Sequence, residues 1–155
     1  MKNIDHMAPL AQRQGMPVEV PEGFERLNRG SPFVELVGPL YGKRIDGRNI
    51  VIGMRAGPQH ANVKGLVHGG LMLTLADTAL GIAITIANDE VPMVTVNLST
   101  DFVESAHPGD WIEAHVDIQR IGARLAFANC YLMVDGRRIL RASGVFAAKG
   151  KSRKA

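Results

Sequence analysis

The stretch over residues 62–88 constrains this chain more than any other. A loop containing His68-Gly69-Gly70 runs into a long apolar segment, Leu71 to Ala87, whose only formal charge is Asp77. The spacing of the apolar residues predicts one helix that is apolar on nearly every side, as core helices are. Burying an ionised carboxylate without partners costs on the order of several kcal/mol. The presence of Asp77 in this apolar helix therefore indicates that its carboxylate has a function.

The polar and small residues of this predicted helix lie on one side. They recur in steps of three and four, which places them on one stripe: Gly70, Thr74, Asp77, Thr78, Gly81 and Thr85. We expect a ligand or a second protein surface to approach along this stripe, because it is kept thin and polar on an otherwise apolar helix.

The start of the predicted helix is a second candidate site. The first turn of a helix has N–H groups without intrahelical partners and carries the positive end of the dipole. Gly69 and Gly70 have no side chains that would keep a ligand from the backbone. A carbonyl held by the Gly69 N–H, with a carboxylate nearby, is an arrangement for acyl transfer. A tight turn from loop to helix is the alternative explanation of the glycine pair.

The remaining sequence predicts an α+β protein with an antiparallel sheet and a helix on one face. We expect a flexible N-terminal arm over 1–20, a single domain over 21–148 and a basic tail over 149–155. Proline and acidic residues favour a short helix over 21–27. Before the long helix, apolar runs predict strands over 33–38, 40–45 and 49–55, followed by a loop over 56–67. After it, alternation and turn signals predict strands over 94–102, 111–120, 124–134 and 138–148.

Charge and composition exclude several classes of function. The net charge is +3, and the tail alone supplies four basic residues, Lys149, Lys151, Arg153 and Lys154. Without a basic face we expect no nucleic-acid partner. Residues 71–88 are barely long enough to span a membrane, and Asp77 argues against it. Because residues 1–20 contain no apolar run like that of a signal peptide, we expect a cytoplasmic protein.

Cysteine and histidine give no sign of a metal site. The single cysteine, Cys130, lies in an alternating segment and is expected to be a small core residue. The five histidines show no metal-ligand spacing, and no Ser-His-Asp signature is visible. We expect no metal and no cofactor.

Residues 33–148 resemble a known family, the hotdog-fold acyl-CoA thioesterases of the phenylacetate-pathway (PaaI-like) type. The matching segments are Asn62 six residues before His68-Gly69-Gly70, Leu75-Ala76-Asp77-Thr78-Ala79, Thr95-Val96-Asn97-Leu98-Ser99, Gly109-Asp110 and Gly122-Ala123-Arg124. The resemblance implies a curved antiparallel sheet wrapped around one long central helix, in a homodimer or homotetramer with its sites at the dimer interface.

The resemblance also implies a role for each matching residue. Asp77 stands where the family has its catalytic carboxylate, a general base or a nucleophile, and the Gly69 N–H where the thioester carbonyl is polarised. Asn62 stands where a polar side chain orients the carbonyl or water, His68 organises the loop, and Thr95 stands where some members position water. Gly70, Thr78 and Arg124 are candidate substrate-binding residues, Arg124 for the phosphates of coenzyme A.

Three functions remain open at this point. Hydrolysis of an acyl-CoA thioester to free acid and coenzyme A is the main hypothesis. A hotdog hydratase or dehydratase is an alternative, although such enzymes use a different spacing of histidine and acid. A non-catalytic acyl-CoA-binding module is the third. The sequence does not indicate the acyl group.

Overall fold

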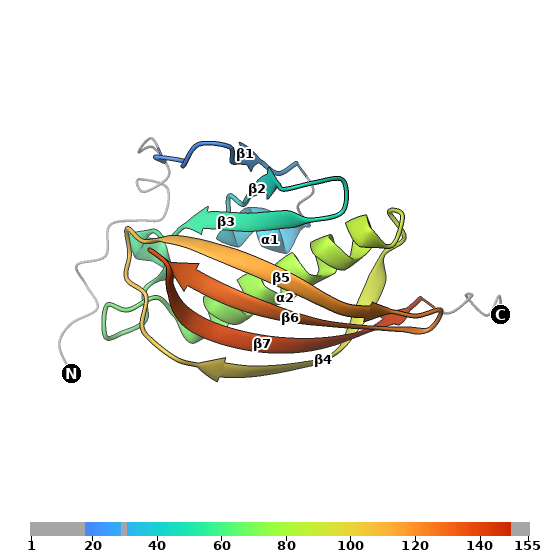
Figure 1. The fold of residues 1–155 in the computed structure, drawn as a ribbon. Coiled ribbons are helices and arrows are strands. Elements are labelled where there is room, and N and C mark those ends of the chain that lie inside the picture. The colour runs from blue at the N-terminus through green and yellow to red at the C-terminus, as the bar shows by residue number, and fades with distance from the viewer. Residues whose placement is uncertain (1–17, 29–30, 150–155) are drawn as a thin grey trace.

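The fold is one antiparallel sheet that curves around a long helix. The computed structural model describes residues 18–28 and 31–149. Seven strands pair in the order β1-β2-β3-β5-β6-β7-β4, and every pairing is antiparallel. The strands are β1 (Glu25–Arg26), β2 (Tyr41–Arg44), β3 (Ile50–Arg55), β4 (Met93–Phe102), β5 (Trp111–Ile121), β6 (Leu125–Val134) and β7 (Arg137–Ala148). Figure 1 shows the long helix lying across the sheet. The α+β hotdog architecture implied by the resemblance is confirmed.

The long helix α2 (Gly69–Ala87) forms where the apolar spacing predicts it. His68 is its N-cap, with an extended backbone and a side chain that accepts a hydrogen bond from the Gly70 N–H. The helix ends at Asn88, and the next two residues, Asp89 and Glu90, have positive φ angles of 51° and 65°. That backbone conformation does not continue a helix, so the polar sequence after Ala87 ends it.

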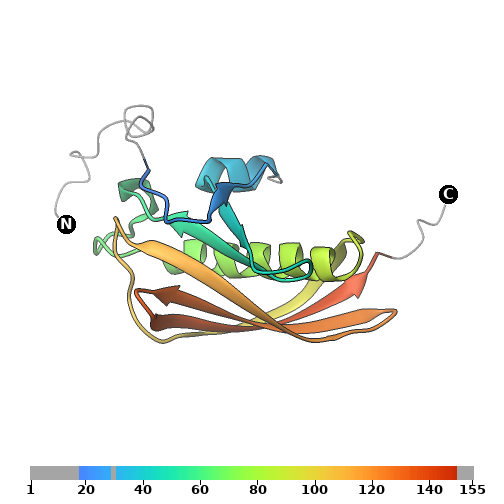
Figure 2. The same cartoon turned by 45° about the horizontal axis from the view of Figure 1, so that its top comes forward.

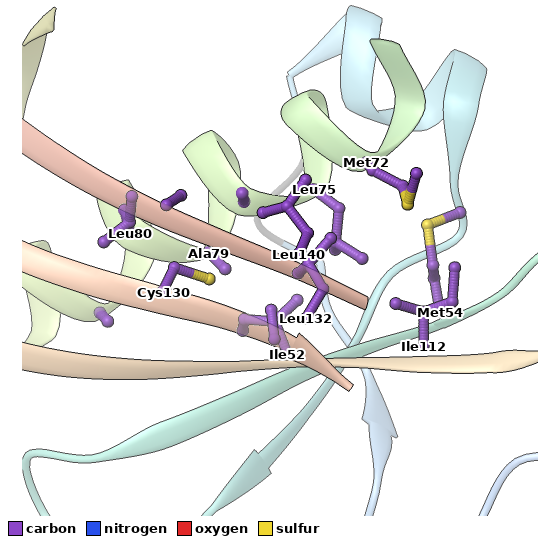
Figure 3. Packing of buried hydrophobic residues seen from close by; sticks show 14 of the residues in the cluster. Ile52, Met54, Met72, Leu75, Ala79, Leu80, Ile112, Cys130, Leu132 and Leu140 are labelled. Carbon is purple, nitrogen blue, oxygen red and sulfur yellow. The ribbon is translucent and has the colours of Figure 1, made fainter. Parts of the chain in front are cut away.

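The core lies between α2 and the concave face of the sheet. Leu75, Leu80, Ile112 and Leu132 are almost fully buried there, and Figure 3 shows residues of this cluster extending from helix and strands toward one another. By length and composition α2 is apolar enough to cross a membrane, but half of that span is buried inside the described part of the chain. Burial against the sheet therefore accounts for its apolar character.

Two predicted elements near the start of the chain are wrong. Residues 33–38 form no strand and lie largely in the helix α1 (Pro32–Val37). Ser31 is the N-cap of this helix, and its hydroxyl accepts from the Val34 N–H at 3.3 Å. A serine cap followed by proline is a strong helix start, and it outweighs the β-propensity of the valines. Figure 2 shows α1 on the side of α2 that faces away from β6 and β7.

The predicted helix over 21–27 is also absent. Gly23 has a φ of +84°, which breaks a helix, and Glu25–Arg26 instead pairs with β2 as the strand β1. The other predicted strands are found with small shifts at their ends, and the predicted loop over 56–67 contains the 3-10 helix η2 (Pro58–His60). The predicted arm over 1–20 lies mostly, and the basic tail almost entirely, outside the described residues.

The strand β4 is an edge of the sheet. It pairs with β7 along one side, and no described strand pairs with its other side. A bulge between Thr95 and Asn97 interrupts the alternation, and Val96 and Phe102 are 61% and 52% exposed. An exposed apolar edge strand is a template for pairing with another chain.

Candidate active site

Asp77 lies on α2 opposite the edge strand β4. Its Oδ1 accepts a hydrogen bond of 2.8 Å from the hydroxyl of Thr95, and its side chain is half-buried. The structure thus brings together two residues that are 18 positions apart in the sequence. A hydroxyl that donates to a carboxylate fixes the rotamer of that carboxylate and leaves its other oxygen free for a further contact.

Three side chains of the polar stripe of α2 are paired within one chain. The hydroxyl of Thr74 donates to the Gly70 carbonyl at 2.9 Å, and that of Thr85 donates to the Gly81 carbonyl at 2.8 Å. Such bonds to the preceding turn are an ordinary way for threonine to be paired in a helix. Asp77 is partnered by Thr95, so the stripe alone does not require a second subunit.

The N–H groups of the two glycines at the start of α2 differ in their hydrogen bonding. The Gly70 N–H donates to Nδ1 of His68 at 2.9 Å, so the cap already occupies it. The Gly69 N–H, at the first position of the helix, donates to no acceptor among the described residues. Because the first N–H groups of a helix have no intrahelical partners, Gly69 offers an open donor at the positive end of the dipole.

The open Gly69 backbone borders a hollow of about 290 Å³ at the end of β4. Its lining combines apolar side chains with polar groups: Asn62, Leu66, Val67, Gly69, Met72, Phe102, Val103, Glu104 and Ser105. A Cβ placed on Gly69 would lie 3.1 Å from the ring of Phe102. We did not predict Phe102 from the sequence, because its distance from Gly69 along the chain gives no signal of this contact.

Asn62 forms a turn and also faces this hollow. Its Oδ1 accepts from the backbone N–H groups of Lys64 and Leu66, at 2.8 and 3.3 Å. Turn formation is a common reason for asparagine in a loop. The turn uses only the oxygen of the amide, so Nδ2 is the part of Asn62 that has donors to offer a ligand.

The two remaining candidates lie away from the hollow. Thr78 lines a small space between α2 and α1, together with Val34 and Val37. Arg124 is exposed at the turn between β5 and β6, where its carbonyl accepts from the Ala148 N–H at 2.8 Å. Neither lies beside the open Gly69 N–H within one chain.

Gly69 and Asp77 of one chain do not act on the same carbonyl directly. Eight residues of helix separate them, which is about 12 Å along the axis at about 1.5 Å per residue. Reacting groups must come within about 3–3.5 Å of each other. The described chain therefore holds two half-sites, an oxyanion donor at one end of β4 and a carboxylate near the other.

Two buried groups have shifted pKa values. Burial lowers the pKa of His60, an effect that its hydrogen bond with the Val37 carbonyl partly offsets. Burial raises the pKa of the Cys130 thiol to about 12, so the predicted role of Cys130 as a small core residue is consistent with its environment. Among residues 18–28 and 31–149, no three His, Cys, Asp or Glu side chains are grouped to hold a metal ion.

A second hollow, of about 320 Å³, lies beside Trp111 and contains none of the candidate residues. Three of the polar side chains around it are paired within the chain: the Trp111 indole donates to Glu113, and the Arg55 guanidinium donates to the carbonyls of Glu19 and Gly109. This second hollow is not lined by Asp77 or Gly69, so the hollow at Gly69 is the better candidate for the active site.

Comparison with known proteins identifies the family. A family model for the thioesterase superfamily matches residues 64–140, which include α2 and β4 to β6. The protein named "Putative esterase PA0474" of Pseudomonas aeruginosa is 42% identical over 130 residues, covering 83% of this chain and 97% of that protein. The chain therefore belongs to the thioesterase superfamily, and it is a thioester hydrolase.

Solved structures show the same fold. A variant of the phenylacetic acid degradation protein PaaI from Thermus thermophilus has a TM-score of 0.69 at 22% identity, covering 77% of this chain and all of that chain. A hypothetical thioesterase of Streptococcus pneumoniae, solved with coenzyme A, has a TM-score of 0.66 at 17% identity, covering 72% of this chain and 90% of that chain. The resemblance stated from the sequence is confirmed for family and fold.

Proposed function

We propose that this protein hydrolyses an acyl-CoA thioester to a free acid and coenzyme A. The observation that carries the proposal is the pair of half-sites along β4. At one end the Gly69 N–H, which has no acceptor among the described residues, borders a hollow, and near the other end Thr95 holds the Asp77 carboxylate. An oxyanion donor and a placed carboxylate together can catalyse acyl transfer to water.

A second copy of the chain would complete each site. When an edge strand pairs with its own copy in antiparallel fashion about a two-fold axis, residues equally far from the centre lie opposite each other. With Val96, the extra residue of the bulge, left out of the count, a centre at Ser99 sets Thr95 opposite Phe102 of the second copy. Asp77, which Thr95 holds, then approaches the Gly69 that Phe102 contacts. The exposed apolar edge of β4 supports this pairing.

In the proposed reaction the thioester carbonyl oxygen accepts the Gly69 N–H of one subunit. Asp77 of the other subunit takes a proton from a water molecule, whose oxygen adds to the carbonyl carbon. The oxyanion collapses, the carbon–sulfur bond breaks, and the coenzyme A thiolate takes the proton from Asp77, which regenerates the carboxylate. Direct attack by Asp77 followed by hydrolysis of the anhydride gives the same products, and both routes use the same geometry.

The other residues support this chemistry from the edges of the site. Asn62 lines the hollow, and its Nδ2 would orient the carbonyl or the water. His68 holds the loop by capping α2. Arg124 is exposed and free to meet a phosphate of coenzyme A. The coenzyme A in the related Streptococcus structure supports this choice of substrate. The proposed reaction takes place in the cytoplasm and needs no cofactor.

The decisive experiment separates the two half-sites by mutation. Gly69→Pro removes the N–H and adds a ring. Proline is favoured at the first helical position, and the extended His68 backbone, with φ −64° and ψ 132°, is compatible with a following proline. Gly69→Ala is the matched control, since it places a Cβ beside Phe102 but keeps the N–H. Asp77→Asn removes the carboxylate with little change in shape.

Over a panel of aromatic and aliphatic acyl-CoAs, we expect Gly69→Pro to lose about 10²–10³ in kcat and Asp77→Asn about 10²–10⁴. A heterodimer of the two variants, co-expressed with different tags, should recover about half of the wild-type rate, because one of its two sites is intact. An inactive heterodimer would show that Gly69 and Asp77 do not meet across the interface. A wild type that hydrolyses none of the panel would overturn the proposal and favour acyl-CoA binding, or hydration of crotonyl-CoA, instead.

A further inference from the structure

His60 is the only polar residue buried among residues 18–28 and 31–149, at 7% exposure. It lies at the end of η2, eight residues before His68. Both nitrogens of its ring are paired: Nδ1 with the Gly57 N–H at 2.8 Å, and Nε2 with the Val37 carbonyl at 2.7 Å. A buried polar group that is fully paired rigidifies the segments it joins.

The partners of His60 determine its tautomer. The Val37 carbonyl only accepts, so Nε2 must carry the proton that it donates. The Gly57 N–H only donates, so Nδ1 must be unprotonated. The ring is therefore neutral and is a donor on one side and an acceptor on the other. Few side chains replace both contacts at once, which makes this position sensitive to conservative substitution.

The backbone of His60 links the ring to the helix start. The His60 carbonyl accepts from the His68 N–H at 2.8 Å, and the His60 N–H donates to the Gly57 carbonyl at 3.0 Å. His68 then caps α2 through the Gly70 N–H. A continuous set of hydrogen bonds thus runs from Val37, at the end of α1, through His60 to the residue that precedes Gly69.

We propose that His60 is a positioning residue that fixes the Gly69 N–H by joining the His68 loop to the end of α1; this inference rests on the proposed function of Gly69. The α1 end of the link is itself held in place, because Val34 and Val37 pack against the core beside α2. His60 touches no part of the proposed substrate site and acts through His68.

Misalignment of this donor has a kinetic signature. The Gly69 N–H is used most strongly when the oxyanion forms, so its displacement lowers kcat and leaves KM nearly unchanged. A displacement of about 1 Å costs up to about 10²-fold in rate. A residue that only stabilises the fold lowers the melting temperature and leaves the kcat of the folded enzyme unchanged.

Two conservative variants separate the contacts of His60. The amide of His60→Asn reaches the position of Nδ1, so it keeps the Gly57 contact and leaves the Val37 carbonyl unpaired. The amide of His60→Gln reaches the position of Nε2, so it keeps the link to Val37. Kinetics of the full-length variants at about 15 °C, with the most active acyl-CoA of the panel, are compared with amide hydrogen exchange over residues 66–72.

We expect His60→Asn to lose about tenfold or more in kcat with KM within about twofold, and to exchange faster at residues 68–71. His60→Gln should stay within about threefold of wild type in kcat, with exchange unchanged. A folded His60→Asn protein with wild-type kcat, or with unchanged exchange at 68–71, would overturn the inference. If the wild type hydrolyses no acyl-CoA, the proposed function fails, but the hydrogen-exchange comparison still tests whether His60 holds the loop at residues 68–71.

Discussion

The hydrogen bond between Thr95 and Asp77 gives a prediction with a definite size. Thr95→Val removes the hydroxyl that donates to Asp77 at 2.8 Å and keeps the shape and β-propensity of the side chain. A hydrogen bond to a charged group contributes about 1.5–3 kcal/mol, and the exposure of Thr95 places this one at about 1.5 kcal/mol. Since about 1.36 kcal/mol is a factor of ten in rate, kcat should fall about tenfold.

The assay is release of the coenzyme A thiol, followed with a thiol reagent. Cys130 adds little background in the folded enzyme, because burial raises the pKa of its thiol to about 12. Thr95→Ser is the matched control: it keeps the hydroxyl, so its rate should stay within about threefold of wild type.

A double-mutant cycle with Asp77→Asn tests the physical cause. If Thr95 acts by orienting the carboxylate, Thr95→Val should change the residual rate of Asp77→Asn by less than about twofold, giving a coupling energy of about 1.5 kcal/mol. An equal loss in both backgrounds would mean that Thr95 acts on something other than Asp77. A Thr95→Val enzyme as fast as wild type would refute the reasoning directly.

Two further predictions concern stability. Because burial lowers the pKa of His60 below its ordinary value of 6.5, the unfolded chain takes up the proton first as the pH falls. The stabilisation that neutral His60 gives the folded state is complete above pH 6.5 and is lost below it. The difference in melting temperature between wild type and His60→Gln should therefore shrink as the pH falls from about 7.5 to about 5. A constant difference would contradict this assignment. Gly144→Ala places a Cβ 2.7 Å from the ring of Phe146 and 3.0 Å from Leu80, so urea unfolding should show a loss of about 1–3 kcal/mol. Gly47→Ala, which meets no atom within 4 Å, should be close to neutral, and equal effects of the two alanines would show that the Gly144 contact is relieved elsewhere.

The sequence was most informative where local pattern and burial agree. The long helix, its glycine start and the four strands after it follow from apolar periodicity and turn signals, and the structure places them within a few residues of the predicted ends. The first forty residues were harder to predict. The same apolar residues fit a strand or a helix over 33–38, and the serine–proline start decided between them. At Glu25–Arg26 the available edge of β2 turned a predicted helix into a strand.

The sequence by itself determined that one carboxylate lies in an apolar helix, that a glycine pair opens this helix, and that such a pattern is typical of acyl transfer. Only the tertiary structure decided which groups meet. It pairs Asp77 with Thr95, sets Phe102 against Gly69 and buries the ring of His60 between Val37 and Gly57. The physical reason is that periodicity reports which face of an element is apolar, whereas sheet order and register, set by packing of the whole chain, determine which distant side chains come within hydrogen-bond distance.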